Sequence, residues 1–245
     1  MEINVFMVKS SPAQKIFILA SLLVIFMGCT KKPKKISFND TETLYNAKDE
    51  IVIQSILAEE GNESFEYHIR IPKIIDSRTK NNNIKTFNDE VESYTNEIIN
   101  NLESAAQNIK QESKKPSLKI DYEIYHGYGI YTIIVSATQV INNTSIINHR
   151  SYYIKDNGDY IYNIDEILKV EEAFPYFTQR IKEEIDKMYP NNLLFDLQQA
   201  VVYFENKKII VKFPLYVFNL DDTENTQNIF EFSEEEAIKY IKRIK

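Results

Sequence analysis

The chain has 245 residues, of which 43% are hydrophobic and 27% charged, and its formal net charge is −7. These values are typical of a folded globular protein and exclude both a fully disordered chain and a polytopic membrane protein. Its five glycines argue against a glycine-rich phosphate loop. Its one cysteine excludes an internal disulfide and a thiolate zinc cluster, and its three histidines argue against a histidine-rich metal site.

The amino terminus is predicted to be an export signal. Lys9 and Lys15 give it a positive start, and residues 16–27 form an uncharged apolar run that is shorter than the about 20 residues of a membrane-spanning helix. Gly28 and Cys29 follow at once, and Cys29 is the only cysteine of the sequence. This pattern resembles a bacterial lipobox, which implies cleavage before Cys29 and diacylation of its thiol. The alternative is an uncleaved apolar anchor with an incidental cysteine.

Residues 29–50 are predicted to form the lipid anchor and a polar tether, whose basic segment at residues 31–35 suits anionic head groups. Because residues 1–28, the predicted signal peptide, contribute a charge of +1, the rest of the chain has −8. An acidic body argues against nucleic acid as a partner and mildly favours a cationic one. We therefore expect an exported protein that a lipid anchors to a membrane on its extracytoplasmic side.

Two strands and a long helix are predicted next along the chain. Residues 51–57 are apolar and β-prone, and in residues 65–75 apolar side chains alternate with polar ones. From Phe87 onwards, apolar residues recur every three or four positions, which predicts a helix over residues 88–112 with one apolar stripe. Asn88 suits the amino-terminal end of that helix.

The middle of the sequence predicts an antiparallel meander. Strands are expected over residues 118–124, 130–141 and 145–155, with a turn at residues 142–144 and another at residues 156–159. The second turn contains Asn-Gly, which is a strong hairpin signal because both residues tolerate a positive φ.

A second amphipathic helix and a hairpin are expected after a short helix or turn at residues 163–168. The helix is predicted over residues 174–188, and the hairpin pairs residues 201–204 with residues 209–218. A capping box at Ser233 is expected to open the last helix.

This order of elements predicts the α+β class, with antiparallel sheets, a meander plus a hairpin, and amphipathic helices packed on one face. A soft boundary near residues 163–172 would give a first α+β domain at residues 51–165 and a second at residues 166–245.

The sequence contains none of the HExxH, GxSxG, Walker or EF-hand motifs. Asp121 and Glu123 share one face of a strand, as paired catalytic acids would, although a solvent face opposite apolar residues also explains them. His126, His149 and a carboxylate could form a metal site, but no spacing supports one. We expect no catalytic residue, metal or cofactor.

Candidate binding residues lie in the predicted strand 145–155. If that strand is at a sheet edge, His149, Arg150 and Tyr152 would present an imidazole, a guanidinium and a phenol together, which are groups suited to recognition. The interpretation that we favour is simpler, with alternate tyrosines of this region filling the core and the others facing water.

Two segments suggest a family. The meander reads LKIDYEIYHGYGIYTIIVSATQVINNTSIINHRSYYIKDNGDYIYNIDEIL, and after a helix the hairpin reads VVYFENKKIIVKFPLYVF. Over residues 50–245 this order resembles the paired domains of unknown function in the ectodomain of the lysozyme-sensing anti-sigma factor RsiV and in the amino-terminal part of the peptidoglycan deacetylase PdaC. The nearest motif matches are Asn148-His149 and residues 162–168. Residues 215–222 depart from the family, because they lack its Gly and Pro.

The resemblance implies a binding module of the cell envelope, with a lysozyme-like cationic protein or peptidoglycan as its partner. It implies no deacetylase activity, because it covers no deacetylase catalytic domain. Two alternatives stay open, a hydrolase that acts on cell-wall material and a structural surface lipoprotein without a specific ligand.

Overall fold

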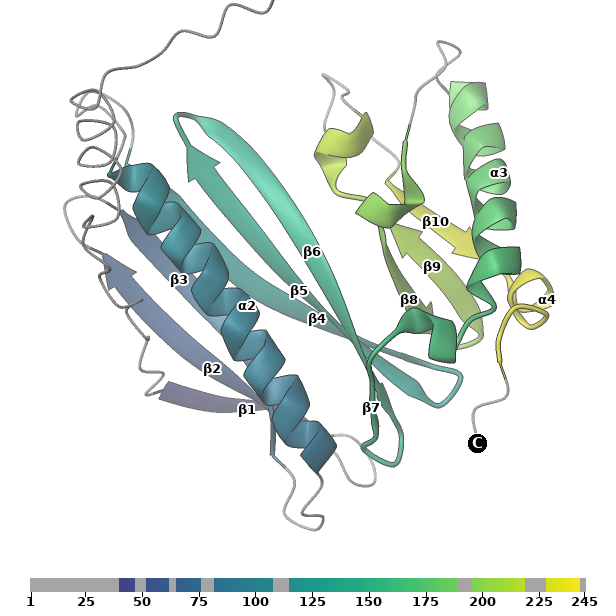
Figure 1. Ribbon diagram of the computed structural model, residues 1–245, viewed down its shortest axis with the longest axis horizontal. Helices are drawn as coiled ribbons and strands as arrows, with labels where there is room; N and C mark the ends of the chain where they lie inside the picture. The colour runs from purple at the N-terminus through teal and green to yellow at the C-terminus, as the bar shows by residue number, and fades with distance from the viewer. Residues whose placement is uncertain are drawn as a thin grey trace, which may run out of the picture. The chain divides into compact units, whose positions relative to one another are not determined.

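A computed structural model describes residues 40–46, 52–61, 65–75, 82–107, 115–188, 195–218 and 228–242 of the chain. These residues form two β-sheets, whose strands are mostly antiparallel, together with α-helices and short 3-10 turns (Figure 1). The predicted α+β class is confirmed.

The two sheets differ in size. The first has seven strands in chain order: β1 (Asp40–Asn46), β2 (Val52–Gly61), β3 (Glu66–Ile75), β4 (Ser117–Gly127), β5 (Ile130–Ile141), β6 (Thr144–Lys155) and β7 (Tyr160–Ile161). The second has the order β10-β9-β8, with β8 (Val201–Glu205), β9 (Lys208–Lys212) and β10 (Ile229–Phe232). The helices are α2 (Asn82–Ala106), α3 (Val170–Met188) and α4 (Glu234–Ala237), and the 3-10 turns are η1 (Ile164–Glu166), η2 (Leu197–Gln199) and η3 (Leu215–Phe218).

β3 and β4 are the one parallel pair among the named strands, and α2 makes the crossover between them. They pair over only four residues each. Beyond that point, Arg70 Nε donates to Asp121 Oδ1 at 2.6 Å, and the hydroxyls of Ser55 and Tyr122 lie 2.7 Å apart. Side chains therefore connect this part of the sheet where the strand pairing ends.

α2 covers one face of the first sheet, as its apolar stripe predicts (Figure 1). The buried cluster between them, here called the α2 core, includes Phe87, Leu102, Ile120, Ile133 and Tyr152. The helix begins six residues before the predicted start, so Asn88 is not its cap. Its side chain instead bonds both backbone groups of Ile74, at 2.9 and 3.0 Å. A side chain that would suit a cap serves here to tie α2 to the end of β3.

The predicted meander is present as β4, β5 and β6. Asn142 and Asn143 both have positive φ angles, 51° and 66°, and form the two-residue turn between β5 and β6. Tyr128 and Gly129 make the corresponding turn between β4 and β5, with φ angles of 55° and 74°. These turns set the register in which alternate residues of each strand face α2.

Several elements differ from the prediction. β9 ends at Lys212, and residues 215–218 form the 3-10 turn η3 instead of a strand. Pro214 explains this break, because it has no N–H to donate to a ladder. β10 was not predicted, and its four residues complete the second sheet. Residues 40–46, expected to belong to the tether, form the edge strand β1, which pairs with β2.

The capping box at Ser233 is confirmed, because Ser233 N donates to Glu236 Oε2 at 3.1 Å. The helix that it opens, α4, has only four residues and is much shorter than the predicted last helix.

The second sheet packs on the first through alternate residues of the meander. Ile133 belongs to the α2 core, whereas its neighbour Ile134 packs with Tyr203 and Ile210 of the second sheet. A further cluster, here called the α3 core, joins Ile130, Tyr153, Phe177, Phe204 and Phe230. β5 is therefore buried on both of its faces.

At Gly127 the backbone of β4 lies close to the turn between β8 and β9. A Cβ atom at this position would lie 2.8 Å from the backbone oxygen of Asn206 and 2.9 Å from backbone atoms of Glu205 and Phe204. Asn206 N also donates to the carbonyl of His126 at 2.8 Å. Only a glycine lets the two backbones approach this closely.

Candidate functional site

Cys29, the predicted lipidation site, lies outside the described residues, as do the apolar run and Gly28 before it. Lipidation of Cys29 and export therefore stay predictions from the sequence. Among the helices in the described ranges, none combines the length and the apolar character that a bilayer crossing requires.

The structure brings two of the three predicted binding residues together. Arg150 lies over two rings, with its guanidinium carbon 5.2 Å from the ring centre of Tyr94 and 5.4 Å from that of Tyr152. Its Nη2 is 3.6 Å from Glu90 Oε2. His149 is not part of this group, because successive residues of a strand face opposite sides of the sheet.

Glu90 and Tyr94 were missed by the sequence analysis. They lie four residues apart on α2 and so share one helix face, which is a spacing that could have indicated a joint role. What the sequence could not show is that this face meets β6, because that contact depends on the tertiary fold.

The tyrosines of this group are packing residues that keep their protons. Tyr152 is 1% exposed, and burial raises the pKa of its phenol and that of Tyr160. Tyr160 donates to Glu90 Oε2 at 2.9 Å. Tyr153 is also buried and Tyr162 is 58% exposed. The expected alternation therefore fails at Tyr152 and Tyr153, which are both buried because the α2 core and the α3 core cover opposite faces of β6 at this point. The group can stack on a ligand or bond to it through Arg150.

His149 lies on the opposite face, next to the second sheet. Its Nδ1 is 2.8 Å from Ser136 Oγ, and the two residues are direct neighbours in the β5–β6 register. Burial, and second the nearby Lys212, lower the pKa of His149 to about 4, against the opposing effect of Glu123. The imidazole is therefore neutral at pH 7 and acts as a hydrogen-bonding group, not as a cation.

The possible catalytic and metal-binding residues form three separate pairs. Asp121 bonds to Arg70, Glu123 Oε2 accepts from Lys212 Nζ at 2.6 Å, and His126 Nε2 lies 2.8 Å from Asp156 Oδ1. No cluster of three or more His, Cys, Asp or Glu side chains that could hold a metal occurs in the described ranges. The structure does not bring Asp121, Glu123 and His126 to one site.

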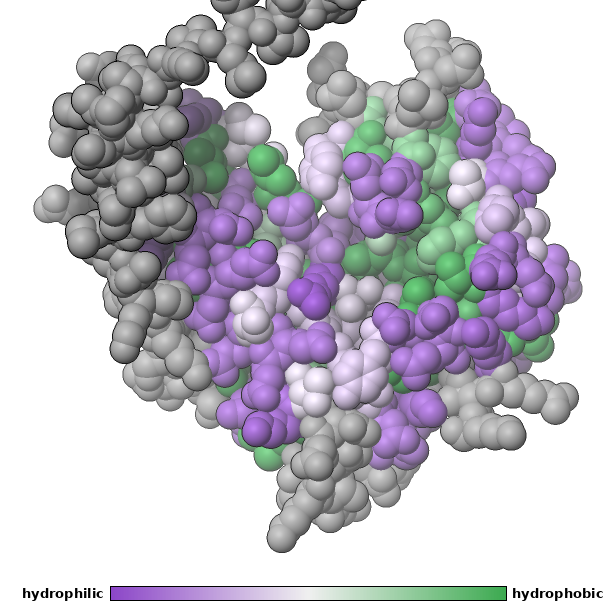
Figure 2. Space-filling view, in the orientation of Figure 1, coloured by the Kyte–Doolittle hydropathy of each residue, from purple (hydrophilic) through white to green (hydrophobic). Residues whose placement is uncertain are grey.

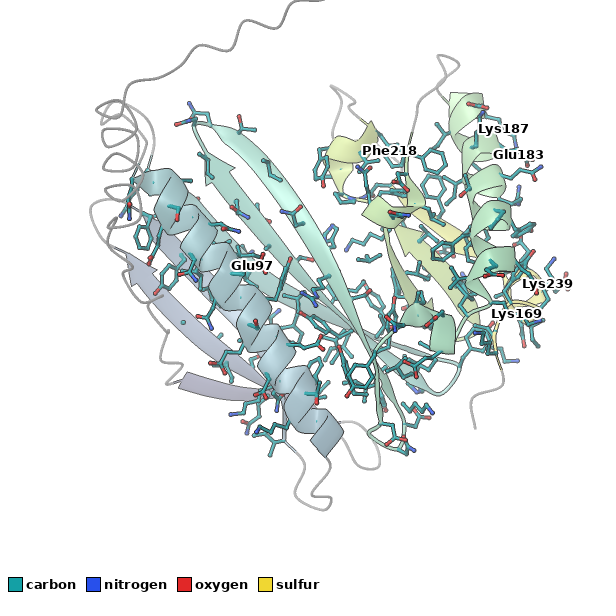
Figure 3. All side chains as sticks on the ribbon, in the orientation of Figure 1. Glu97, Lys169, Glu183, Lys187, Phe218 and Lys239 are labelled. Carbon is teal, nitrogen blue, oxygen red and sulfur yellow. The ribbon has the colours of Figure 1, made fainter. Side chains whose placement is uncertain are left out.

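The exposed side of α2 is acidic and polar. It presents the carboxylates Asp89, Glu92, Glu97 and Glu103, and Lys85 is the one basic residue within the helix bounds. Figure 3 labels Glu97 on this side, and Figure 2 shows the helix surface as mainly hydrophilic. Such a surface attracts cations and cationic proteins over distances of about 10 Å at moderate ionic strength.

No protein-family model matches this chain, and no curated protein matches it at a significant level.

Proposed function

We propose that this chain is a lipid-anchored, extracytoplasmic binding module of the bacterial cell envelope, and that its partner is a cationic protein of the lysozyme type. Export and anchoring rest on the amino-terminal pattern that ends at Cys29. The binding role rests on the resemblance to the RsiV ectodomain and to the amino-terminal region of PdaC.

The single observation behind the choice of partner is the acidic side of α2. Asp89 and Glu97 are exposed, and Glu92 and Glu103 are partly exposed, on a helix whose opposite side packs into the α2 core. The charges are therefore held on a rigid scaffold, which favours an interface over a merely solvated chain. The net charge of the chain, −7, has the sign that would speed the approach of a cationic partner.

The first experiment identifies which class of partner the chain binds. The full chain, extracted in mild detergent, is tested by pull-down against lysozyme, against a cationic protein of different fold and similar charge, and against purified cell-wall sacculi. We expect lysozyme alone to be retained. Retention on sacculi alone would replace the cationic partner by peptidoglycan, and retention on neither would favour the structural lipoprotein. Release of cell-wall fragments would favour the hydrolase.

A charge-neutralising variant tests the surface. Asp89→Asn combined with Glu92→Gln, Glu97→Gln and Glu103→Gln removes the four carboxylates of the acidic side at constant side-chain size and leaves Glu90, the fifth carboxylate of α2, beside Arg150. The control removes the same charge from α3, at Glu171, Glu172, Glu183 and Asp186. We expect at least a tenfold loss of lysozyme affinity for the α2 variant and a small loss for the α3 variant. Equal losses would mean that only the total charge matters.

The anchor is tested separately by mass spectrometry of the membrane-extracted protein. The expected species begins at Cys29 and bears a diacylglyceryl thioether. A protein that keeps residue 1 with an unmodified thiol would contradict the anchoring, whatever the outcome of the binding experiment.

A further inference from the structure

β6 leaves one of its edges free in the described part of the chain. On one side it pairs with β5 along its whole length, from Thr144 to Lys155. On the other side β7 pairs only with Tyr153 and Ile154. Residues 144–152 therefore have no strand partner on that side among the described residues.

The hydrogen-bond pattern shows which backbone groups this edge offers. Asp156 N donates back to Gly129 O, towards β5, whereas Lys155 N donates away from β5 to Asp159 O. Because antiparallel ladders alternate, odd-numbered residues of β6 turn their N–H and C=O groups outwards. In the free segment these are the groups of Ser145, Ile147, His149 and Ser151.

The free edge is accessible and has few of the features that block strand addition. Ile146 is 45% exposed, and although η3 contacts β6, residues 147–149 stay partly exposed. Natural edges are usually protected by charges, prolines or bulges. Here the one charged residue, Arg150, lies back over the Tyr94 ring and next to Glu90.

We propose that this edge pairs with the same edge of a second copy of the chain, antiparallel, about a two-fold axis at Asn148. In that register Ser145 meets Ser151, and Ile147 meets His149, so all eight outward backbone groups of each copy are bonded. Residue 148 is the centre of the segment 144–152, and any other register leaves outward groups unpaired or collides with β7.

The side chains of the edge, with Arg150 as their one charge, favour a second copy as its occupant. In this register Arg150 lies opposite Ile146 of the other copy, so that no two like charges meet across the interface. The cross-strand pairs are polar with polar or apolar with a long side chain, which makes the strand complementary to itself. A two-fold axis also closes the assembly at two copies, because it uses the free edge of both.

Cysteine cross-linking tests the register with the full chain in mild detergent. Across the axis, Asn148 of the two copies forms a non-hydrogen-bonded pair, whose Cα atoms lie about 4.5 Å apart, and disulfides need about 4.4–6.8 Å. Asn148→Cys should therefore give a disulfide-linked dimer under mild oxidation. Ile146→Cys is the matched control, because its two copies would lie about 13 Å apart. The unsubstituted chain measures any background from Cys29.

Two further pairs of variants distinguish backbone hydrogen bonding from nonspecific apolar association. Dimerisation is measured by sedimentation velocity. Ile147→Pro removes an outward N–H without touching the β5 ladder and should weaken dimerisation by about tenfold or more, whereas Ile147→Ala keeps the N–H and should change it less. Ile146→Glu, opposite Arg150 of the other copy, should bind about tenfold more tightly than Ile146→Lys.

A chain that stays monomeric at every concentration overturns the proposal. So does a cross-link that forms equally well at residues 146 and 148, or a loss of dimerisation that is the same for Ile146→Glu and Ile146→Lys, since either would indicate an apolar contact without a register.

Discussion

The α2 core and the α3 core differ in their balance of aliphatic and aromatic side chains. In the described residues, the α2 core holds eleven isoleucines and two phenylalanines, whereas the α3 core holds six of each. The rings of the α3 core contact one another in separate groups, with centres 4.2 Å apart for Phe177 and Phe232 in one group and 5.1 Å apart for Phe213 and Phe218 in another. Figure 3 labels Phe218, the last residue of η3.

The difference follows from the size of the two sheets. Seven strands under a 25-residue helix give a wide surface on which β-branched residues pack well. Three short strands offer little area, which favours large side chains, and aromatic rings bury the most surface per residue. Even so, the α3 core includes Ile130, Tyr153 and Ile161 from strands of the first sheet. We infer that the second sheet depends on the first.

The largest effect is expected from removing one ring of the α3 core. Phe177 is fully buried and contacts Phe232 and Tyr240. Phe177→Ala should lower the free energy of unfolding by about 4 kcal/mol, from lost burial and the cavity left behind. Urea unfolding measures this, with Thr178→Ala on the same helix as the control. A loss below about 1 kcal/mol would mean that the neighbouring rings collapse into the space.

The next largest effect concerns the contact between the two sheets. Gly127→Ala places a Cβ within 2.9 Å of backbone atoms of Glu205 and Phe204, which cannot swing aside as a side-chain tip can. We expect a loss of about 2–3 kcal/mol. Gly129→Ala is the control, because it only strains a φ of 74° and meets no atom closer than 3.5 Å, and it should cost about 1 kcal/mol. Equal losses would show that the close approach is not tight.

The sequence indicates the elements whose pattern is local. The three- and four-residue spacing after Phe87 predicts α2, and the polar turn at residues 142–144 predicts the β5–β6 hairpin. The parallel pairing of β3 and β4 could not be predicted, because it depends on α2 crossing over the sheet. β10 is too short for its alternation to stand out, and it forms because Phe230 and Phe232 complete the α3 core.

The candidate site was also predicted only in part, because some of its contacts depend on the tertiary fold and not on local sequence patterns. Arg150 and Tyr152 were recognised as a possible recognition group, but alternation along the strand sends His149 to the other face. Glu90 and Tyr94 come from α2, and nothing local in the sequence links them to β6. Residues distant in sequence meet through tertiary packing, which residue patterns along one segment do not encode.

A smaller effect is expected from pH at the boundary between the sheets. The pKa of His149 is about 4 in the folded protein, against about 6.5 in an unfolded chain. Between these values the unfolded chain binds more protons, so stability is complete above pH 6.5 and falls as the pH drops towards 4. After allowance for solvent screening, we expect a loss on the order of 1–2 kcal/mol.

Urea unfolding at pH 7, 5.5 and 4.5 measures this dependence, and His149→Gln is the control because it cannot titrate. The variant should have a flatter pH profile than the unsubstituted chain. If stability changed with pH equally in the variant and in the unsubstituted chain, the imidazole of His149 would be solvated, and its position beside Lys212 would not affect the free energy of unfolding.

The smallest change in stability is expected from removing single tyrosine hydroxyl groups of β6. Two such variants, one on each face of the strand, compare the two faces directly. Tyr153 faces the second sheet and donates to the carbonyl of Val202 at 2.7 Å. Tyr153→Phe leaves that carbonyl without this donor and should cost about 1 kcal/mol. Tyr152 faces α2, and its buried hydroxyl has no hydrogen-bond partner among the described residues. Tyr152→Phe should therefore be neutral or slightly stabilising, because an unbonded buried hydroxyl gains nothing from folding. Equal losses in urea unfolding would show that a bound water satisfies the Tyr152 hydroxyl, in which case both faces of β6 use their phenols in the same way.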